Sequence, residues 1–261
     1  MTFRALFAFL LASSALALGT TVNVHPEPAR PGDILVIEAS HYPKRGTLDL
    51  QLLRFVKLPD GRGRALAGVD LEADFSHPPF LDVRWTFAPP LRRTLALRPR
   101  PAVGAVPRTT FRDLPQIDSD LWCRGRPSNP LWRENFVPPV EAEVSLPFAA
   151  PISDGKRWGA LGFLAGVPDI PVRAANDGRV VFAGELGRGV VGVVLDHGGS
   201  VCTVYAPLSE LRVEGGRRVR RGEVLGELSG ETLYWEARVL RARVDPAQLY
   251  ALGSLKGGRF R

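Results

Sequence analysis

Apolar and polar positions alternate in short runs along the first third of the chain. Residues 21–39 indicate a strand, a turn at Pro31-Gly32-Asp33 and a second strand. Three further runs continue this alternation, at residues 48–56, 80–87 and 94–97. Several short strands at such spacing are typical of two sheets packed face to face. We therefore predict a β-sandwich-like domain of immunoglobulin-like type over residues 19–98.

The last third of the chain is also built of short apolar runs, but glycine interrupts them at close intervals. This pattern predicts a compact all-β domain with tight turns, which we place at residues 148–252. The expected strands are residues 180–183, 190–195, 201–206 and 233–240. A hairpin is expected within residues 219–228, turning at Arg221-Gly222-Glu223. The tail of residues 253–261 is expected to fray.

Residues 99–147 are rich in proline and lack a regular period. They nevertheless carry large apolar residues that favour burial, namely Phe111, Leu121, Trp122, Leu131, Trp132 and Phe136. We predict a linker that packs on the neighbouring domains, although the tryptophans could instead form an exposed ligand platform. Ser128-Asn129 before Pro130 predicts a short helix over residues 130–135.

Residues 1–18 have the features of a secretory signal peptide. Arg4 gives the positive start, residues 5–16 the apolar stretch, and Ala15-Leu16-Ala17 a small-x-small cleavage site. An uncleaved membrane anchor is the alternative, but the apolar run is short for a bilayer span. We expect no transmembrane segment after cleavage, and a mature protein that is secreted or periplasmic, in the cell envelope.

The formal net charge is +7, and arginine supplies most of the positive charge. Attraction to an anionic polymer or membrane surface is one interpretation, and a solubilising surface is the other. The arginines are scattered and are not interleaved with stacking aromatic residues, so we expect no nucleic-acid partner.

Cys123 and Cys202 are the two cysteines. In an oxidising compartment they could form a disulfide between the linker and the C-terminal domain, or they could be two separately buried thiols. Two cysteines are too few to make a structural zinc site.

The C-terminal segments 171–184, 193–211 and Thr232-Leu233-Tyr234-Trp235-Glu236 resemble, in this order, the lysostaphin-type (LytM-like) zinc metallopeptidases that cut peptidoglycan. The resemblance begins near Pro147. It implies that this all-β domain has the LytM-like, duplicated hybrid motif fold. It also lends support to a β-sandwich-like domain ahead of it.

In that family, zinc is held by the histidine and aspartate of H-x-x-x-D and by the second histidine of H-x-H. The first histidine of H-x-H and one in Tyr-x-His-Leu assist the attacking water. The resemblance places Gly159 and Phe163, or one residue earlier Trp158 and Gly162, at the first two ligand positions. Pro207 replaces the Tyr-x-His-Leu histidine that follows Tyr205, and Thr232 and Tyr234 replace the two histidines of H-x-H.

No good zinc ligand stands at any of these positions, so we predict no catalytic residue, no metal site and no cofactor. A substitute site built from His197, Asp169 and Glu236 would need three distant groups to converge. We interpret His197 as a hydrogen-bonded turn residue, and His25, His41 and His77 as surface residues at strand ends.

The predicted function is that of a non-catalytic LytM-like envelope protein that binds peptidoglycan or regulates a cell-wall amidase. The former active site would be a neutral aromatic groove formed by Trp158, Gly159, Phe163, Tyr205, Pro207, Thr232, Tyr234 and Glu236. The alternative is that these side chains fill the vacated pocket as core. Two other functions stay open: an active zinc endopeptidase with a non-standard site, and a structural envelope adaptor.

Overall fold

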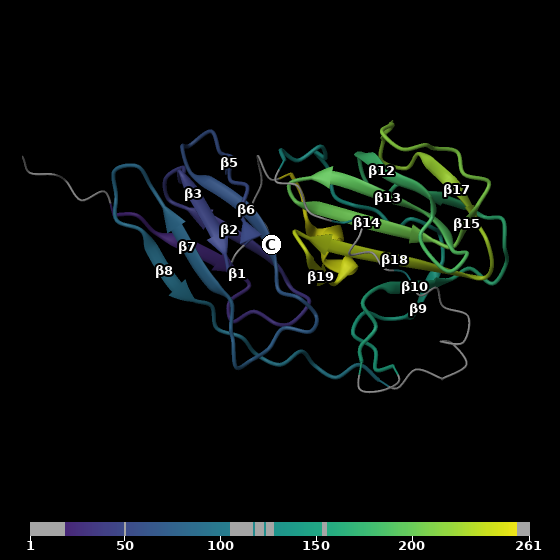
Figure 1. Ribbon diagram of the computed structural model, residues 1–261, viewed down its shortest axis with the longest axis horizontal. Coiled ribbons are helices and arrows are strands. Elements are labelled where there is room, and N and C mark those ends of the chain that lie inside the picture. The colour runs from purple at the N-terminus through teal and green to yellow at the C-terminus, as the bar shows by residue number, and fades with distance from the viewer. Residues whose placement is uncertain are drawn as a thin grey trace, which may run out of the picture.

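The computed structural model describes residues 19–49, 51–104, 117, 123, 128–152 and 156–254. Nearly all regular structure in these ranges is β-strand, which confirms the all-β prediction (Figure 1). The predicted signal peptide and the tail from residue 255 lie outside the described residues. Within the described part, no helix has the length and apolar character that a bilayer span requires.

Two four-stranded antiparallel sheets form the N-terminal domain, on the left of Figure 1. The first has the order β1-β2-β6-β5, with β1 Val22–His25, β2 Ile34–Ala39, β6 Gly63–Gly68 and β5 Val56–Lys57. The second has the order β4-β3-β7-β8, with β4 Gln51–Leu52, β3 Arg45–Leu48, β7 Phe80–Arg84 and β8 Leu91–Thr94. Leu35 and Ile37 of β2 share one buried cluster with Leu81 and Val83 of β7. The two sheets therefore enclose a common core, as the sandwich prediction requires.

The sequence pattern missed β6 and misplaced β8. All six residues of β6 are buried, so no apolar–polar alternation marks this strand. The run predicted at residues 94–97 overlaps β8 only at Thr94, and beyond it Leu97 forms an isolated bridge with Ala29.

An eight-stranded sheet forms most of the C-terminal domain, with the order β16-β12-β13-β14-β18-β10-β9 and β19 paired to β18. Its strands are β9 Glu143–Leu146, β10 Leu161–Leu164, β12 Gly178–Glu185, β13 Val191–Gly198, β14 Val201–Ala206, β16 Arg218–Val219, β18 Thr232–Val239 and β19 Ala242–Val244. A smaller sheet has the order β11-β17-β15, with β11 Pro171–Arg173, β17 Val224–Leu228 and β15 Leu208–Ser209. The 3-10 helix η4 follows at Pro246–Ala251. Because β9 pairs with β10, the sheet begins at Glu143, inside the segment predicted as linker.

The hairpin predicted within residues 219–228 is wrong. Strand β16 pairs with β12, whereas β17 pairs with β11 and β15, so the turn at Arg221-Gly222-Glu223 connects two different sheets.

The helix predicted over residues 130–135 is also wrong. The Leu131 N–H donates to His197 O, and the Gly199 N–H donates to Ser128 O, so this backbone bonds to the β13–β14 turn instead of coiling. Trp132 and Phe136 are buried and their rings meet edge to face, which supports the packed-linker interpretation for these two residues. Phe111, Leu121 and Trp122 lie outside the described residues.

The two domains share a continuous core. Ile34 and Leu66 of the first N-terminal sheet belong to the same buried cluster as Val244 of β19 and Leu249 of η4. The approach is so close at β6 that a Cβ atom on Gly68 would lie 2.8 Å from the Val244 Cγ1 atom. These contacts hold the N-terminal sandwich directly against the C-terminal sheet.

Polar contacts reinforce the same interface. The Asp245 N–H donates to Gly32 O at 2.8 Å. Arg100 forms ion pairs with Asp33 of the N-terminal domain and with Asp245 at the start of η4.

Candidate functional site on the C-terminal sheet

Strand β18 presents its alternate residues to two different clusters. Leu233, Trp235 and Ala237 belong to the cluster shared with the N-terminal domain. Tyr234 points to the other face of the sheet and belongs to a second cluster with Trp158 and Leu146. Because successive side chains of a strand alternate between faces, Thr232, Glu236 and Arg238 share the face of Tyr234.

On that face the residues at the ligand positions do come together. Gly162 lies directly opposite Tyr234 in the β10–β18 pairing, and Leu164 lies opposite Thr232. The ring of Trp158 meets that of Tyr234 edge to face, with centroids 5.2 Å apart. The structure thus brings together Trp158, Gly162 and Tyr234, which selects the earlier of the two registers considered for the H-x-x-x-D positions.

Phe163 and Tyr205 lie on the opposite face, so their assignment to the candidate groove is wrong. Phe163 is paired with Leu233, and its ring centroid is 6.1 Å from that of Trp235. Tyr205 is fully buried, and its hydroxyl accepts a hydrogen bond from the Ala175 N–H at 3.0 Å. The physical reason is the strand period of two, which sends residue 163 away from residue 162.

Glu236 is the centre of a buried polar group on the same face of β18 as Tyr234. The Tyr234 hydroxyl donates to one carboxylate oxygen of Glu236, and Arg238 Nε donates to the other. Burial, and then the negative charge of Glu236, raise the pKa of Tyr234 well above its usual value, so the phenol stays protonated. The arginine compensates the carboxylate charge inside the sheet.

Pro207 takes the place of a proton acceptor. It directly follows Ala206, the residue opposite Tyr234 in the β14–β18 pairing. Its ring carries no ionisable group, and its carbonyl oxygen accepts a hydrogen bond from the Ser229 N–H at 3.1 Å. Nothing in the side chain of Pro207 could assist a water molecule.

The chain itself covers this face, so the prediction of an open aromatic groove is wrong for its central members. Trp158 is 9% exposed, Tyr234 is 7% exposed and Glu236 is 1% exposed. Cys123 of the proline-rich segment forms a disulfide with Cys202 of β14, and Ile117 packs against the same cluster. The alternative interpretation, in which these side chains fill the vacated pocket as core, describes them correctly. Gly159, Pro207 and Thr232 keep partial exposure.

A zinc ion does not fit this arrangement. No imidazole, carboxylate or thiolate stands at positions 158, 162, 207, 232 or 234. In the later register, Gly159 takes the histidine position of H-x-x-x-D. A Cβ atom on Gly159 would lie 3.1 Å from the Arg243 Cδ atom, so a cationic side chain lies beside that position. A Cβ atom on Gly162 would lie 2.8 Å from the Leu146 Cβ atom, so an apolar side chain occupies the space next to Tyr234.

The substitute site considered from the sequence is not assembled. His197 Nδ1 donates to Asp177 O at 2.8 Å, and its Nε2 lies 2.8 Å from Thr203 Oγ1. Thr203 pairs with Ala237, so His197 bonds to the opposite face of the sheet from Glu236. Burial lowers the pKa of His197 to about 4, which keeps the ring neutral. Across the described ranges, no three His, Cys, Asp or Glu side chains are grouped closely enough to hold a metal ion.

Three functional features escaped the sequence analysis. Leu146 of β9 and Arg243 of β19 lie next to Gly162 and Gly159, and no local motif marks either residue. Arg238 could have been found, because its even spacing from Tyr234 and Glu236 places it on their face of a strand.

Comparison with known proteins identifies the origin of this domain. Residues 162–246 match the family model of peptidase family M23. The chain is 33% identical over 124 residues to the DD-carboxypeptidase/endopeptidase Mpg of Neisseria meningitidis, covering 44% of this chain and 29% of that protein. The same values hold for the Mpg protein of Neisseria gonorrhoeae. The match thus spans less than a third of the length of these curated relatives.

A crystal structure classed with peptidase M23 from Pseudomonas aeruginosa is similar over both domains. It has a TM-score of 0.62 and 24% identity, and it covers 86% of this chain and 95% of the other. This similarity concerns the fold. The glycine-punctuated sheet, the register of β10 on β18 and the family match together define a metallopeptidase-type domain. Residues 162–246 of this chain thus form a domain of the peptidase family M23 type.

Proposed function

We propose that this protein is a non-catalytic M23-domain protein of the cell envelope, which binds peptidoglycan without cutting it. The observation that carries the proposal is the composition of the former catalytic face. Trp158, Gly162 and Tyr234 meet where three zinc ligands would be needed, and none of them offers a lone pair suited to zinc.

The rest of the face supports the same conclusion. A zinc hydrolase needs an open coordination position and a nearby base to manage the proton of the attacking water. Here Tyr234 is held protonated by burial and by Glu236, whose carboxylate is already engaged by Arg238. Cys123, joined to Cys202, belongs to the cluster on this part of the sheet, and Trp158, Tyr234 and Glu236 are buried there.

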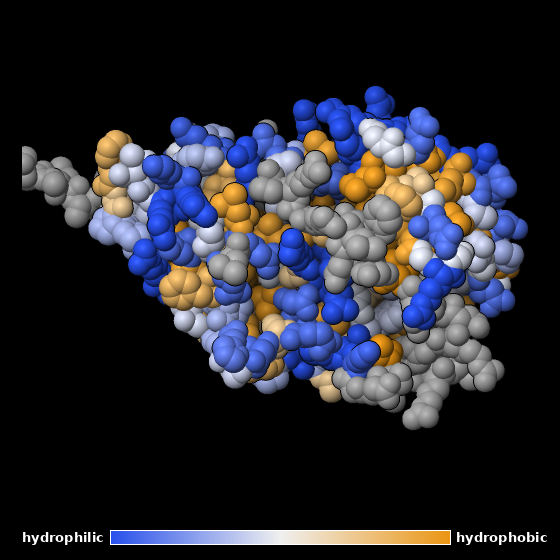
Figure 2. All heavy atoms as spheres, in the orientation of Figure 1, coloured by the Kyte–Doolittle hydropathy of each residue, from blue (hydrophilic) through white to orange (hydrophobic). Residues whose placement is uncertain are grey.

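The choice of peptidoglycan is supported by relatives and by charge. The curated relatives are named DD-carboxypeptidase/endopeptidase, and a DD-carboxypeptidase acts on cell-wall peptides. Peptidoglycan peptides carry free carboxylates, which a chain of net charge +7 attracts. Hydrophilic residues are spread over both domains on the face drawn in Figure 2.

An exported location is part of the proposal. The disulfide between Cys123 and Cys202 favours an oxidising compartment such as the periplasm or the extracellular space. The amino-terminal sequence Met1 to Ala17, with its apolar run, points in the same direction.

The test combines metal analysis, a digestion assay and a pelleting assay on the mature protein. Purified protein is assayed for zinc before and after incubation with zinc sulfate, and then mixed with purified sacculi. We expect zinc far below stoichiometric amounts, no soluble cell-wall fragments, and protein that sediments with the sacculi. An active M23 peptidase serves as the positive control for fragment release.

Other outcomes would overturn parts of the proposal. Stoichiometric zinc together with fragment release would show an active endopeptidase. Protein that stays in the supernatant would contradict peptidoglycan binding. If that protein also accelerated digestion by an added cell-wall amidase, the function would be hydrolase regulation instead.

A further inference from the structure

A cleft at the boundary between the two domains has the properties of a ligand site. Its volume is about 320 Å³, near the lower end of the range for small-molecule pockets. Its lining comes from the end of β1, the β1–β2 connection, β2 and the segment after β8 on one side, and from η4 and the residue after it on the other. It is separate from the former catalytic face of β18.

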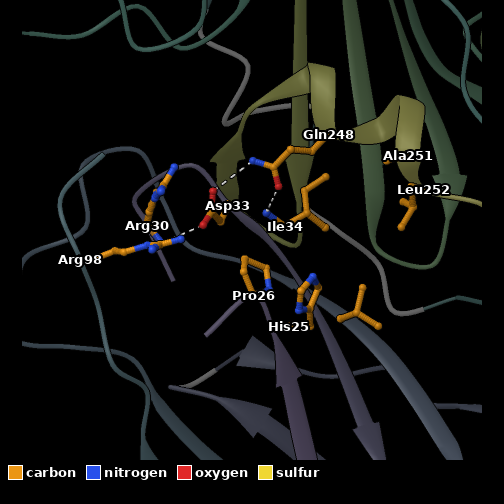
Figure 3. Close-up of a pocket in the computed structure, with 10 residues that line it drawn as sticks. His25, Pro26, Arg30, Asp33, Ile34, Arg98, Gln248, Ala251 and Leu252 are labelled. Carbon is orange, nitrogen blue, oxygen red and sulfur yellow. Dashed lines mark hydrogen bonds between the residues drawn. The ribbon is translucent and has the colours of Figure 1, made fainter. Parts of the chain in front are cut away.

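One side of the cleft is cationic. Arg30 and Arg98 line it together, and in Figure 3 both lie at the end of the cleft away from Ala251 and Leu252. The Nε atom of Arg30 is buried and has no hydrogen-bond partner within the described residues. Arg98 is exposed, and neither arginine forms an ion pair with a described residue.

The carboxylate in the cleft is already committed to other partners. Asp33 accepts hydrogen bonds from the Arg30 backbone N–H at 2.8 Å and from Gln248 Nε2 at 3.1 Å, as Figure 3 shows. It also forms an ion pair with Arg100 at 3.4 Å. Asp33 is therefore held in place by the interface. Arg30 and Arg98 also line the cleft, and neither pairs with a carboxylate of the described residues.

The opposite side of the cleft is apolar. Ile34, Val36 and Leu252 are buried and line it, and Ala251 adds a methyl group at its rim. A cleft with a cationic end and an apolar end matches a ligand that carries an anionic group next to a small apolar group. The arginine fork is suited to bind a carboxylate through two parallel hydrogen bonds.

We infer that this interdomain cleft binds the C-terminal carboxylate of a short peptide whose last residue has a small apolar side chain. The carboxylate lies against Arg30 and Arg98, and the side chain lies against Ala251 and Leu252. A singly charged carboxylate suits the cleft better than a doubly charged phosphate, because the Asp33 carboxylate lines the same space. The inference rests on the proposed function, since an uncross-linked peptidoglycan peptide with a terminal alanine offers such a group.

The test uses calorimetric titration of the mature protein with acetyl-D-alanyl-D-alanine. The matched ligands are its C-terminal amide, which lacks the charge, and inorganic phosphate, which lacks the apolar group. We expect binding of the free acid, and affinity at least about 10-fold weaker for the amide and for phosphate.

Variants then locate the site. Arg30→Gln and Arg98→Gln remove the cationic end, and Ala251→Phe fills the apolar end without changing the charge. Each substitution should weaken the affinity for the free acid by about 10-fold or more. Arg179 is an exposed arginine on β12, and Arg179→Gln should leave that affinity unchanged. Circular dichroism spectra and melting curves confirm that each variant is folded.

The outcomes separate this inference from the proposed function. Equal binding of acid and amide, or wild-type affinity in the folded Ala251→Phe and Arg30→Gln variants, would overturn the cleft as a carboxylate site. If the unmodified protein still sedimented with sacculi, peptidoglycan binding would stand and only the cleft would be lost. Tight binding of phosphate with none of the peptide would assign the cleft to a different anion and likewise reject the inference.

Discussion

Gly162 lies directly across from Tyr234 in the pairing of β10 with β18. On its other side Gly162 pairs with Leu146 of β9, whose side chain takes the space that a side chain at position 162 would need. In an active member of the family, an aspartate and a histidine would face each other at this pair. Here the absence of a Cβ atom on residue 162 lets β9 close onto β10, so apolar packing fills the space at this pair.

Gly162→Ala should therefore destabilise the protein by about 1–3 kcal/mol, because the added methyl group overlaps Leu146. Urea unfolding measures the change. The penalty should persist in a Leu146→Ala background, because the contacting atom is the Cβ atom that alanine keeps, and it should shrink in a Leu146→Gly background, as double-mutant cycles would show. Gly159→Ala is the matched control: its methyl group meets only the flexible Arg243 side chain and should cost much less. Equal penalties at both glycines would contradict the packing described for residue 162.

The disulfide should be a main source of stability. Cys123 and Cys202 are 79 residues apart, and closing a loop of this length contributes about 4 kcal/mol on the chain-entropy model. Thermal melting with and without a reductant tests this, and the melting temperature should fall by several degrees on reduction. A Cys123→Ala/Cys202→Ala variant should melt at the lower temperature and be insensitive to the reductant.

Glu236→Gln should be more harmful than Tyr234→Phe. Removing the carboxylate takes away the negative charge that compensates the buried Arg238 guanidinium, which costs about 3–5 kcal/mol. Removing the Tyr234 hydroxyl takes away one hydrogen bond to a carboxylate that retains Arg238, which costs about 1–2 kcal/mol. Free energies of unfolding from urea titrations give both values, and the reverse order would contradict the role assigned to Glu236.

His197 should make stability fall as the pH is lowered. Burial lowers the pKa of its folded form to about 4, whereas the unfolded chain has the ordinary value of about 6.5. The unfolded state therefore binds a proton first, and stability present above pH 6.5 is lost as the pH falls toward 4. Between pH 7 and pH 4.5 this group should account for roughly 2 kcal/mol.

The His197→Asn variant isolates that contribution. It is expected to be less stable than the wild type at pH 7, and its stability should fall less steeply toward pH 4.5. A pH dependence as steep as that of the wild type would show that other groups are responsible.

The sequence predicted the strands whose two faces differ in polarity and whose ends carry turn residues, such as β1, β2 and β12. It missed β6, because a strand buried on both faces carries no alternation. The hairpin after Val219 failed for another reason: β16 and β17 find their partners in distant segments, which a local pattern does not contain.

The candidate site shows the same division. The replacement of every family ligand could be read from residue types alone. The register could not, since a shift of one residue at position 162 or 163 reverses the face of the sheet, and only the pairing with Tyr234 fixes it. The sequence also left open whether the pocket is a groove or a filled core, because the packing depends on Leu146 and Arg243, which come from other strands.

Because side chains alternate along β18, the residues that pack the core and the residues of the candidate site lie on different faces of the strand. Leu233, Trp235 and Ala237 belong to the shared core, while Thr232, Tyr234 and Glu236 lie on the opposite face of the strand. Each set can therefore be exchanged without disturbing the other. The residue types on one face of such a strand are thus not fixed by the core packing on its other face.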